Sequence, residues 1–214
     1  MDRYLQGAVL WPPGRTRLRV YYVPPPEPIR PLIDAYRGAL APFDFIAPVA
    51  GEWLHATIAA VQDRWASDVT PRQLNAVESR LRQELSDLLE FTVQAGGALA
   101  SRHGVTIDLI PDQDFVELIR RTSGVFTEIF GPEAADYDGG RPHLALAYGT
   151  GPGDSGLVQG RLRNATDLRV RLQVAEVRLV EVSQDLVRHH VRWRELAQIP
   201  LAQIPLALNN RGET

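Results

Sequence analysis

The stretch Trp53-Leu54-His55-Ala56-Thr57-Ile58 places a histidine and a threonine two residues apart among apolar side chains. Side chains alternate across a β-strand, so residues two apart share a face. In a strand, His55 and Thr57 therefore lie on one face and Ala56 and Ile58 on the other. We expect a strand over residues 53–61 that presents an imidazole and a hydroxyl together.

A second stretch, Arg141-Pro142-His143-Leu144-Ala145-Leu146, has the same layout. Here His143 and Ala145 share one face, and the two leucines point into the core. Two strands that offer one imidazole each can place an acid and a base on either side of one small group. Histidine suits both roles because its unperturbed pKa, about 6.5, is close to working pH.

Length and composition restrict the class of protein. The chain has 214 residues, a formal net charge of −3 and no cysteine. This length fits one large domain or two small lobes. Without cysteine there are no disulfides, no thiolate catalysis and no cysteine-ligated metal sites. The charge does not indicate a broad nucleic-acid-binding surface, but a small phosphorylated ligand or one end of an RNA needs only a local basic pocket.

The sequence contains no sign of a membrane or export segment. Residues 1–6 lack the charged-then-apolar layout of a secretion signal. No apolar run approaches the ~18–20 residues that a membrane helix requires. We expect a soluble cytoplasmic protein that does not bind membranes, with a monomer favoured.

Hydrophobic periodicity predicts strands and helices along the whole chain. Strands are expected over residues 16–23, 43–49, 53–61, 91–99, 105–110, 141–148, 168–182 (as one or two strands) and 190–196. Helices are expected over 28–40, 70–89 and 112–130, whereas the glycine-rich segment 149–160 resembles a flexible loop. This order favours an α+β fold with two lobes over a doubly wound parallel sheet.

The chain ends in a tandem repeat, AQIPL at 197–201 and again at 202–206. Its two prolines argue against a central strand, because proline cannot donate to a sheet ladder. We expect an edge strand or a tail here, and treat residues 1–214 as one bilobal domain with a tail from about 202.

Paired His-x-Thr/Ser motifs on strands at this separation resemble the signature of the two-histidine phosphoesterase superfamily. The motif at 55–58 matches it fully, whereas Ala145 replaces the hydroxyl residue in the motif at 143–146. The chain as a whole is similar to bacterial members described as 2′-5′ RNA ligase or RNA 2′,3′-cyclic phosphodiesterase. The resemblance implies two antiparallel sheets that line a central cleft, with helices outside.

The resemblance also implies a metal-independent phosphodiesterase without a cofactor. It would act on 2′,3′-cyclic phosphates, or on 2′-5′-linked RNA ends or small nucleotides. One of His55 and His143 would activate water or a hydroxyl, and the other would protonate the leaving oxygen. Thr57 would bind a non-bridging phosphate oxygen. The sequence leaves open which histidine is the acid.

Ala145 cannot provide the second hydroxyl, and loss of one oxyanion donor costs on the order of 100–1,000-fold in rate. Arg141 would share a strand face with His143 and replace part of this contact. Tyr22 and Tyr148, like Tyr21, are candidates to stack a base, with strand core as the alternative interpretation.

For the remaining polar residues, the sequence predicts the following positions. Arg17 and Arg19 face either the cleft or solvent, and surface positions are expected for His103, His189 and His190. Asp136 and Asp138 form a solvated loop rather than a metal site, because no spaced histidine accompanies them.

Two further functions remain open. Ala145 is also compatible with a nucleotide- or RNA-end-binding protein that keeps the cleft and hydrolyses poorly. Alternatively, the same scaffold would apply its histidines to a non-phosphate substrate.

Overall fold

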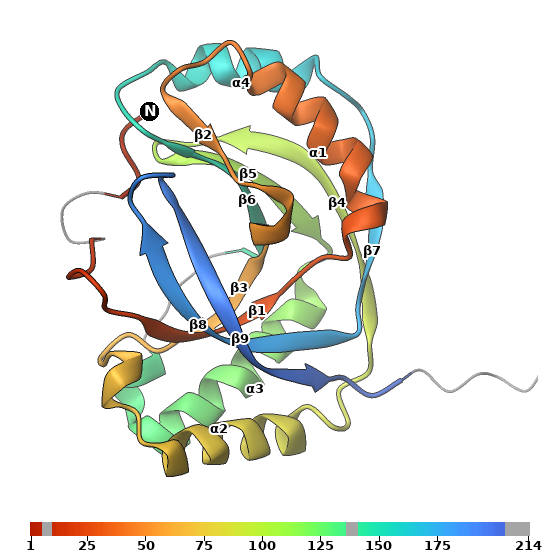
Figure 1. The fold of residues 1–214 in the computed structure, drawn as a ribbon. Coiled ribbons are helices and arrows are strands. Elements are labelled where there is room, and N and C mark those ends of the chain that lie inside the picture. Colours follow the sequence, from red (N-terminus) through yellow and green to blue (C-terminus); the bar gives the residue numbers. More distant parts are fainter. Residues whose placement is uncertain (6–9, 136–140, 204–214) are drawn as a thin grey trace, which may run out of the picture.

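The computed structural model describes residues 1–5, 10–135 and 141–203, and shows an α+β fold of two antiparallel sheets with helices outside them (Figure 1). One sheet has four strands and the other has five. This confirms the predicted fold class. A single cluster of buried apolar residues includes members of both sheets.

The four-stranded sheet has the order β3-β1-β8-β9, with every pair antiparallel. Its strands are β1 (Arg17–Tyr22), β3 (Ala56–Ala60), β8 (Glu176–Asp185) and β9 (His190–Pro200). The strand of the first motif, β3, is therefore an edge strand. The first four residues of β1 are alternately half-buried and buried, the pattern expected for a strand with one face on the core, and Tyr21 and Tyr22 are both buried.

The five-stranded sheet has the order β2-β6-β5-β4-β7, again antiparallel throughout. Its strands are β2 (Ile46–Pro48), β4 (Phe91–Ala100), β5 (Gly104–Ile110), β6 (His143–Gly149) and β7 (Val170–Val174). The strand of the second motif, β6, lies between β2 and β5. The two motifs therefore belong to different sheets.

Two pairs of helices cover the outer faces of the sheets. α2 (Pro71–Glu84) and α3 (Gln113–Phe130) pack on the four-stranded sheet, and α1 (Pro26–Leu40) and α4 (Ser155–Arg163) on the five-stranded sheet (Figure 1). Each of α1, α2 and α3 buries one apolar stripe, as its helical spacing predicts. Among the residues that the structure describes, no helix is long and apolar enough to cross a membrane.

Side-chain caps explain where α2 and α4 begin. Thr70 caps α2: its side chain accepts a hydrogen bond from the backbone N–H of Gln73, whose own side chain accepts one from the N–H of Thr70. Helix α4 begins inside the segment predicted as a loop. There, the Asp154 carboxylate accepts hydrogen bonds from the N–H groups of Gly156 and Leu157. This N-cap outweighs the low helix propensity of the glycines.

The segment 168–182, expected to form one or two strands, contributes to two, β7 and β8. The chain leaves β7 in one sheet, passes through Ala175, and enters β8 in the other sheet. Apolar and polar residues largely alternate through both strands, buried against exposed in β7 and buried against half-buried in β8, so the sequence pattern runs across the change of sheet almost unbroken.

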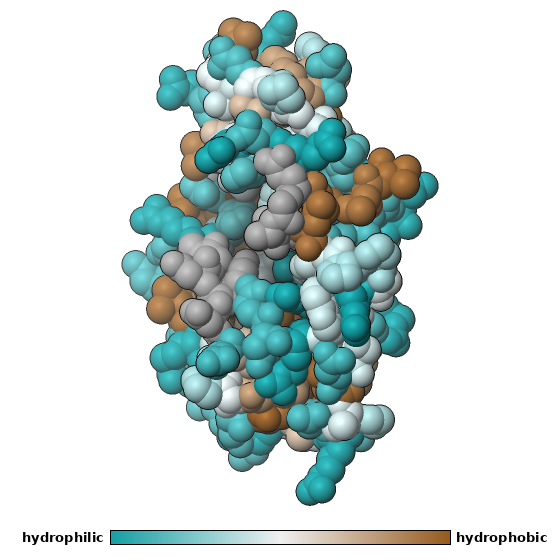
Figure 2. Space-filling view, turned by 90° about the vertical axis from the view of Figure 1, so that its left-hand side faces the viewer, coloured by the Kyte–Doolittle hydropathy of each residue, from teal (hydrophilic) through white to brown (hydrophobic). Residues whose placement is uncertain are grey.

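Residues 197–200 of the first copy lie in the edge strand β9, as predicted, and Ile199 and the following Leu201 are buried. Ala202 then pairs with Leu89 in an isolated bridge, and residues 204–206 of the second copy lie outside the described residues. The face of the molecule in Figure 2 is largely hydrophilic, with scattered apolar residues.

Candidate active site

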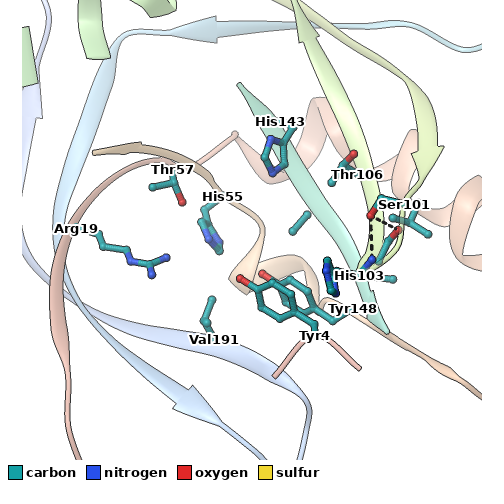
Figure 3. Close-up of a pocket in the computed structure, with 14 residues that line it drawn as sticks. Tyr4, Arg19, His55, Thr57, Ser101, His103, Thr106, His143, Tyr148 and Val191 are labelled. Atoms are coloured by element: carbon teal, nitrogen blue, oxygen red, sulfur yellow. Dashed lines mark hydrogen bonds between the residues drawn. The ribbon is translucent and has the colours of Figure 1, made fainter. Parts of the chain in front are cut away.

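The two motif strands bring His55 and His143 to one cavity of about 200 Å³ (Figure 3). Thr57 and Ala145 line the same cavity. His55 lies just before β3, after a short 3-10 turn at Gly51–Trp53, and His143 is the first residue of β6. Both imidazoles thus sit where a strand begins, one from each sheet.

The two histidines are held in the same way. The Nδ1 atom of His55 lies 2.8 Å from the carbonyl oxygen of Trp53, and Nδ1 of His143 lies 2.8 Å from that of Arg141. A carbonyl oxygen only accepts hydrogen bonds, so Nδ1 carries the proton in both rings. The neutral rings therefore keep an unprotonated Nε2, the atom that can accept or, once protonated, return a proton.

His55 is enclosed by aromatic rings. It is only 5% exposed; its ring stacks on Tyr21 with centroids 4.0 Å apart, and Trp193 meets it edge-on at 5.0 Å. Burial lowers the pKa of His55 to about 4, with smaller contributions in the same direction from the charges of Arg19 and His143 and opposition from the hydrogen bond to Trp53. His55 is therefore neutral at pH 7 in the free protein.

His143 has a more open setting. It is half-buried, in contrast to His55. In the β5–β6 register, Asp108 is its partner on the neighbouring strand, and Thr106 is the partner of Ala145. The two imidazoles thus face one cavity from environments of different polarity.

Groups that suit an anion lie beside the histidines. Arg19 extends from β1 into the cavity, and Thr57 lies close by on β3 (Figure 3). The Arg19 guanidinium also lies over the ring of Trp11, 5.5 Å from its centroid. A cation and a hydroxyl in a partly buried site are the usual partners of phosphate oxygens.

The remaining wall is built from the turn between β4 and β5 and from two tyrosines. Tyr4 and Tyr148 stack on each other with ring centroids 4.4 Å apart (Figure 3). The other lining residues are Ser101, His103, Gly104, Val105, Thr106, Ala147 and Val191. An aromatic pair at the rim of a small polar cavity can support a planar ring such as a base.

Comparison with known proteins decides what this architecture resembles. No family model and no curated protein matches the chain. Solved structures do match: TT0787 of Thermus thermophilus has a TM-score of 0.67 at 16% identity, over 87% of this chain and 98% of that one. E. coli LigT in its apo form has a TM-score of 0.62 at 19% identity, over 88% of this chain and 99% of that one. The chain has the LigT fold.

Other structures support this assignment. E. coli LigT complexed with 3′-AMP has a TM-score of 0.60 at 21% identity, with 88% of this chain and 99% of that chain covered. Because the aligned regions span nearly all of LigT, the likeness concerns the whole fold rather than one lobe. The predicted resemblance to the two-histidine phosphoesterases is thereby confirmed at the level of the fold.

Within the LigT fold, five of the seven predicted site residues line the cavity. These are His55, Thr57, His143, Ala145 and Tyr148. Tyr22 lies elsewhere: it is buried, its hydroxyl donates to the carbonyl oxygen of Gln173, and its ring packs against Phe115. Consecutive residues of a strand point to opposite faces, so Tyr21 stacks on His55 whereas Tyr22 points into the main core.

Arg141 is also outside the cavity. Strand β6 begins only at His143, so the expected shared strand face does not extend to Arg141. Its side chain is 79% exposed and lies 3.5 Å from the Asp112 carboxylate. The contribution of Arg141 to the site is its backbone carbonyl, which orients His143.

The positions of four other residues, Arg17, Arg19, His103 and His190, can also be compared with their predictions. Arg19 faces the cavity, whereas Arg17 donates to Gln62 and lies over Trp65. His103 is exposed, as predicted for a turn, yet it lines the cavity. His190, predicted on the surface, is only 5% exposed because it begins the paired strand β9.

Sequence reasoning missed Thr106 and the aromatic enclosure of His55. Thr106 and Asp108 are polar residues two positions apart in an otherwise apolar strand. This alternation in the sequence could have predicted that they share a face. No nearby residue in the sequence indicated that Trp193 contacts His55, because Trp193 belongs to β9, which is distant from His55 along the chain. Among the described residues, no cluster of three or more His, Cys, Asp or Glu could hold a metal ion; Asp136 and Asp138 lie outside those residues.

Proposed function

We propose that this protein is a phosphodiesterase that uses His55 and His143 as an acid–base pair on one phosphodiester bound between them. Its substrates would be 2′,3′-cyclic phosphates, or 2′-5′-linked RNA ends or small nucleotides. The observation that carries the proposal is that both imidazoles line one small cavity, each with Nδ1 bound to a carbonyl and Nε2 left for proton transfer.

The chemistry needs a base on the attacking side and an acid on the leaving side. One neutral imidazole takes a proton from water as the water oxygen bonds to phosphorus. The other, protonated, gives its proton to the ribose oxygen as the P–O bond breaks. Each ring ends in the protonation state in which the other began, so proton exchange with solvent resets the pair.

A bound phosphate changes the balance between the two rings. Burial and neighbouring positive charge keep His55 neutral in the free protein. An anion between the rings favours the protonated form of each by charge attraction. Substrate binding therefore moves the pKa of His55 up, toward the range in which it exchanges protons at neutral pH.

Charge on the phosphoryl oxygens would be met by Arg19 and by the Thr57 hydroxyl, both at the cavity. Preorganised donors of this kind are the largest catalytic term in many enzymes. The Tyr4–Tyr148 pair would support a base or ribose at the rim. Structures of E. coli LigT complexed with 3′-AMP, ATP, NADP+ and phosphate support a small nucleotide as the ligand class.

The test is hydrolysis of nucleoside 2′,3′-cyclic phosphates in the presence of a chelator. We expect turnover with chelator, and loss of roughly 1,000-fold or more in kcat for His55→Ala and for His143→Ala, since each removes a proton-transfer group. If the chain turns over no cyclic phosphate, or only without chelator, the proposal is wrong in this form. Full activity in either histidine variant would also contradict it.

One observation favours a second function. Ala145 occupies the place of the second motif's hydroxyl, so a chain that binds nucleotide or RNA ends with little turnover fits the same cavity. In that case cyclic phosphate binds without product, and Ala145→Thr raises turnover. Fast hydrolysis by the unchanged protein argues against this alternative.

A further inference from the structure

The second motif lacks a hydroxyl at Ala145, but the neighbouring strand provides one. In the antiparallel register of β5 and β6, Thr106 is the direct partner of Ala145, two positions from the pair formed by Asp108 and His143. Directly opposed residues point to the same face, with Cβ atoms about 4.5–5.5 Å apart. Thr106 therefore presents its side chain on the same face as Ala145 and His143.

We propose that Thr106 is the second hydroxyl of the site, and that it donates to a non-bridging phosphate oxygen in place of the residue missing at 145. This inference rests on the proposed function and names a further residue of the same site. The hydroxyl moves no proton between reactants. It stabilises the negative charge that grows on the phosphoryl oxygen, opposite the contact made by Thr57.

Burial supports this orientation of Thr106. Thr106 lines the cavity and is half-buried (Figure 3). Val105, which also lines the cavity, and Ile107, which does not, are both fully buried. An irregularity in the register falls between Val105 and Thr106, where two residues of β6 are passed in one step. This irregularity brings Thr106, rather than an apolar residue, opposite Ala145.

The Thr106 hydroxyl is also available. Within the described ranges, no hydrogen-bond partner of its Oγ1 atom is present, and rotation about one side-chain bond redirects it. The nearby Ser101 hydroxyl differs, because it donates to the carbonyl oxygen of Gly104 and accepts from the N–H of His103. Since Arg141 is exposed and paired with Asp112, Thr106 is the better candidate.

The small side chain at 145 fits the same arrangement. Alanine leaves room above β6 for a phosphate oxygen to approach the threonine on β5. Because the hydroxyl residue lies on β5 at Thr106 instead of on β6 at position 145, one hydrogen-bond donor remains on this side of the cavity.

The test compares Thr106→Val, which removes the hydroxyl at nearly constant shape, with Thr106→Ser, which keeps it. For Thr106→Val we expect kcat for a 2′,3′-cyclic phosphate to fall by about 100-fold, the effect of removing one oxyanion donor. Thr106→Ser should stay within about fivefold of the unchanged protein. In Thr106→Val/Ala145→Thr, the hydroxyl returns on β6, and roughly 10-fold or more of the loss should be recovered.

Thr92→Val is the matched control, because Thr92 is exposed on β4 of the same sheet and does not line the cavity. Its kcat should be unchanged. A Thr106→Val protein with unchanged kcat overturns the inference, as does equal loss in Thr106→Ser. A double variant that recovers nothing shows that Thr106 acts through packing, and also overturns it. Thermal unfolding of each variant separates misfolding from loss of the contact.

A second readout distinguishes this inference from the proposed function. If the unchanged protein hydrolyses no cyclic phosphate, the proposed reaction fails, yet inorganic phosphate can still be titrated against the His143 ring resonances. We then expect Thr106→Val to weaken phosphate binding about fivefold or more while Thr106→Ser does not. Equal dissociation constants for Thr106→Val and the unchanged protein overturn the inference without reference to turnover.

Discussion

The ring of Tyr21 lies flat against the imidazole of His55, with centroids 4.0 Å apart and planes 23° from parallel. The ring of Trp193 packs edge-on against the same imidazole, with ring centroids 5.0 Å apart. This enclosure excludes water from a group that is charged once protonated, and it is the main reason why the pKa of His55 falls to about 4.

Opening this enclosure should raise the pKa of His55. In Trp193→Ala, water reaches the ring edge, and the pKa is expected to move up by about one unit or more toward its ordinary value. The pKa is measured by NMR titration of the imidazole resonances. Trp65→Ala is the control, because Trp65 contacts Trp11 and Arg17 rather than His55. An unchanged pKa in Trp193→Ala would show that desolvation by this ring is not the cause.

Removal of the Arg19 charge should raise the pKa of His55 and weaken the binding of phosphate. Its positive charge lowers the pKa of His55. In Arg19→Gln the pKa of free His55 should rise, whereas the dissociation constant for inorganic phosphate should increase by about 10-fold, since a charged hydrogen bond of roughly 1.5 kcal/mol is lost. Isothermal titration calorimetry measures the second effect. Tighter or equal phosphate binding in the variant would contradict the role of Arg19 as an anion contact.

The stability of the protein should depend on the protonation of His55. Its pKa is about 4 in the folded protein, against the ordinary histidine value of 6.5 in the unfolded chain, so between these values the unfolded chain binds more protons. The contribution is complete above pH 6.5 and is lost as pH falls toward 4, by about 3 kcal/mol at most. Urea unfolding at pH 7 and pH 4.5 should show a smaller loss for His55→Gln than for the unchanged protein. His190, whose pKa is lowered in the same direction by burial, is common to both proteins and cancels in this comparison.

Thr57 and Arg141 should differ in their effect on catalysis. Thr57 lines the cavity, so Thr57→Val should lower kcat for a cyclic phosphate by about 100-fold. The Arg141 side chain is 79% exposed and directed to Asp112, so Arg141→Ala should change kcat by less than about threefold. Steady-state kinetics at saturating substrate measure both. The reverse order would show that Arg141 reaches the phosphate when substrate is bound.

Gly104 should be essential for the contact between β5 and β6. A Cβ atom built there would lie 2.2 Å from the carbonyl oxygen of Ala147, so Gly104→Ala forces the two strands apart. We expect it to lower the free energy of unfolding by about 2 kcal/mol, within the range for overpacked sites. Gly124→Ala is the matched control, because a Cβ at this position of α3 meets nothing within 4 Å, and it should stabilise the helix by about 0.5–1 kcal/mol. Chemical denaturation of both variants measures these changes.

Most of the elements can be predicted from the sequence because their signals are local. Period-two alternation locates the strands that carry the motifs, and the spacing of Leu74, Val77 and Leu81 locates α2. Helix α4 escapes prediction because its signal, the cap at Asp154, lies among glycines that usually indicate a loop. The sequence leaves the split of residues 168–182 open because both strands have the same alternating pattern.

The sequence by itself determined which side chains can do chemistry, namely the two histidines and Thr57, because alternation assigns each residue of a strand to a face. Only the tertiary structure decided which faces meet. The enclosure of His55 by Tyr21 and Trp193, and the position of Thr106 opposite Ala145, depend on register between strands that are distant in the chain. Such register is set by packing over the whole core rather than by neighbouring residues, and so are the burial and the pKa that follow from it.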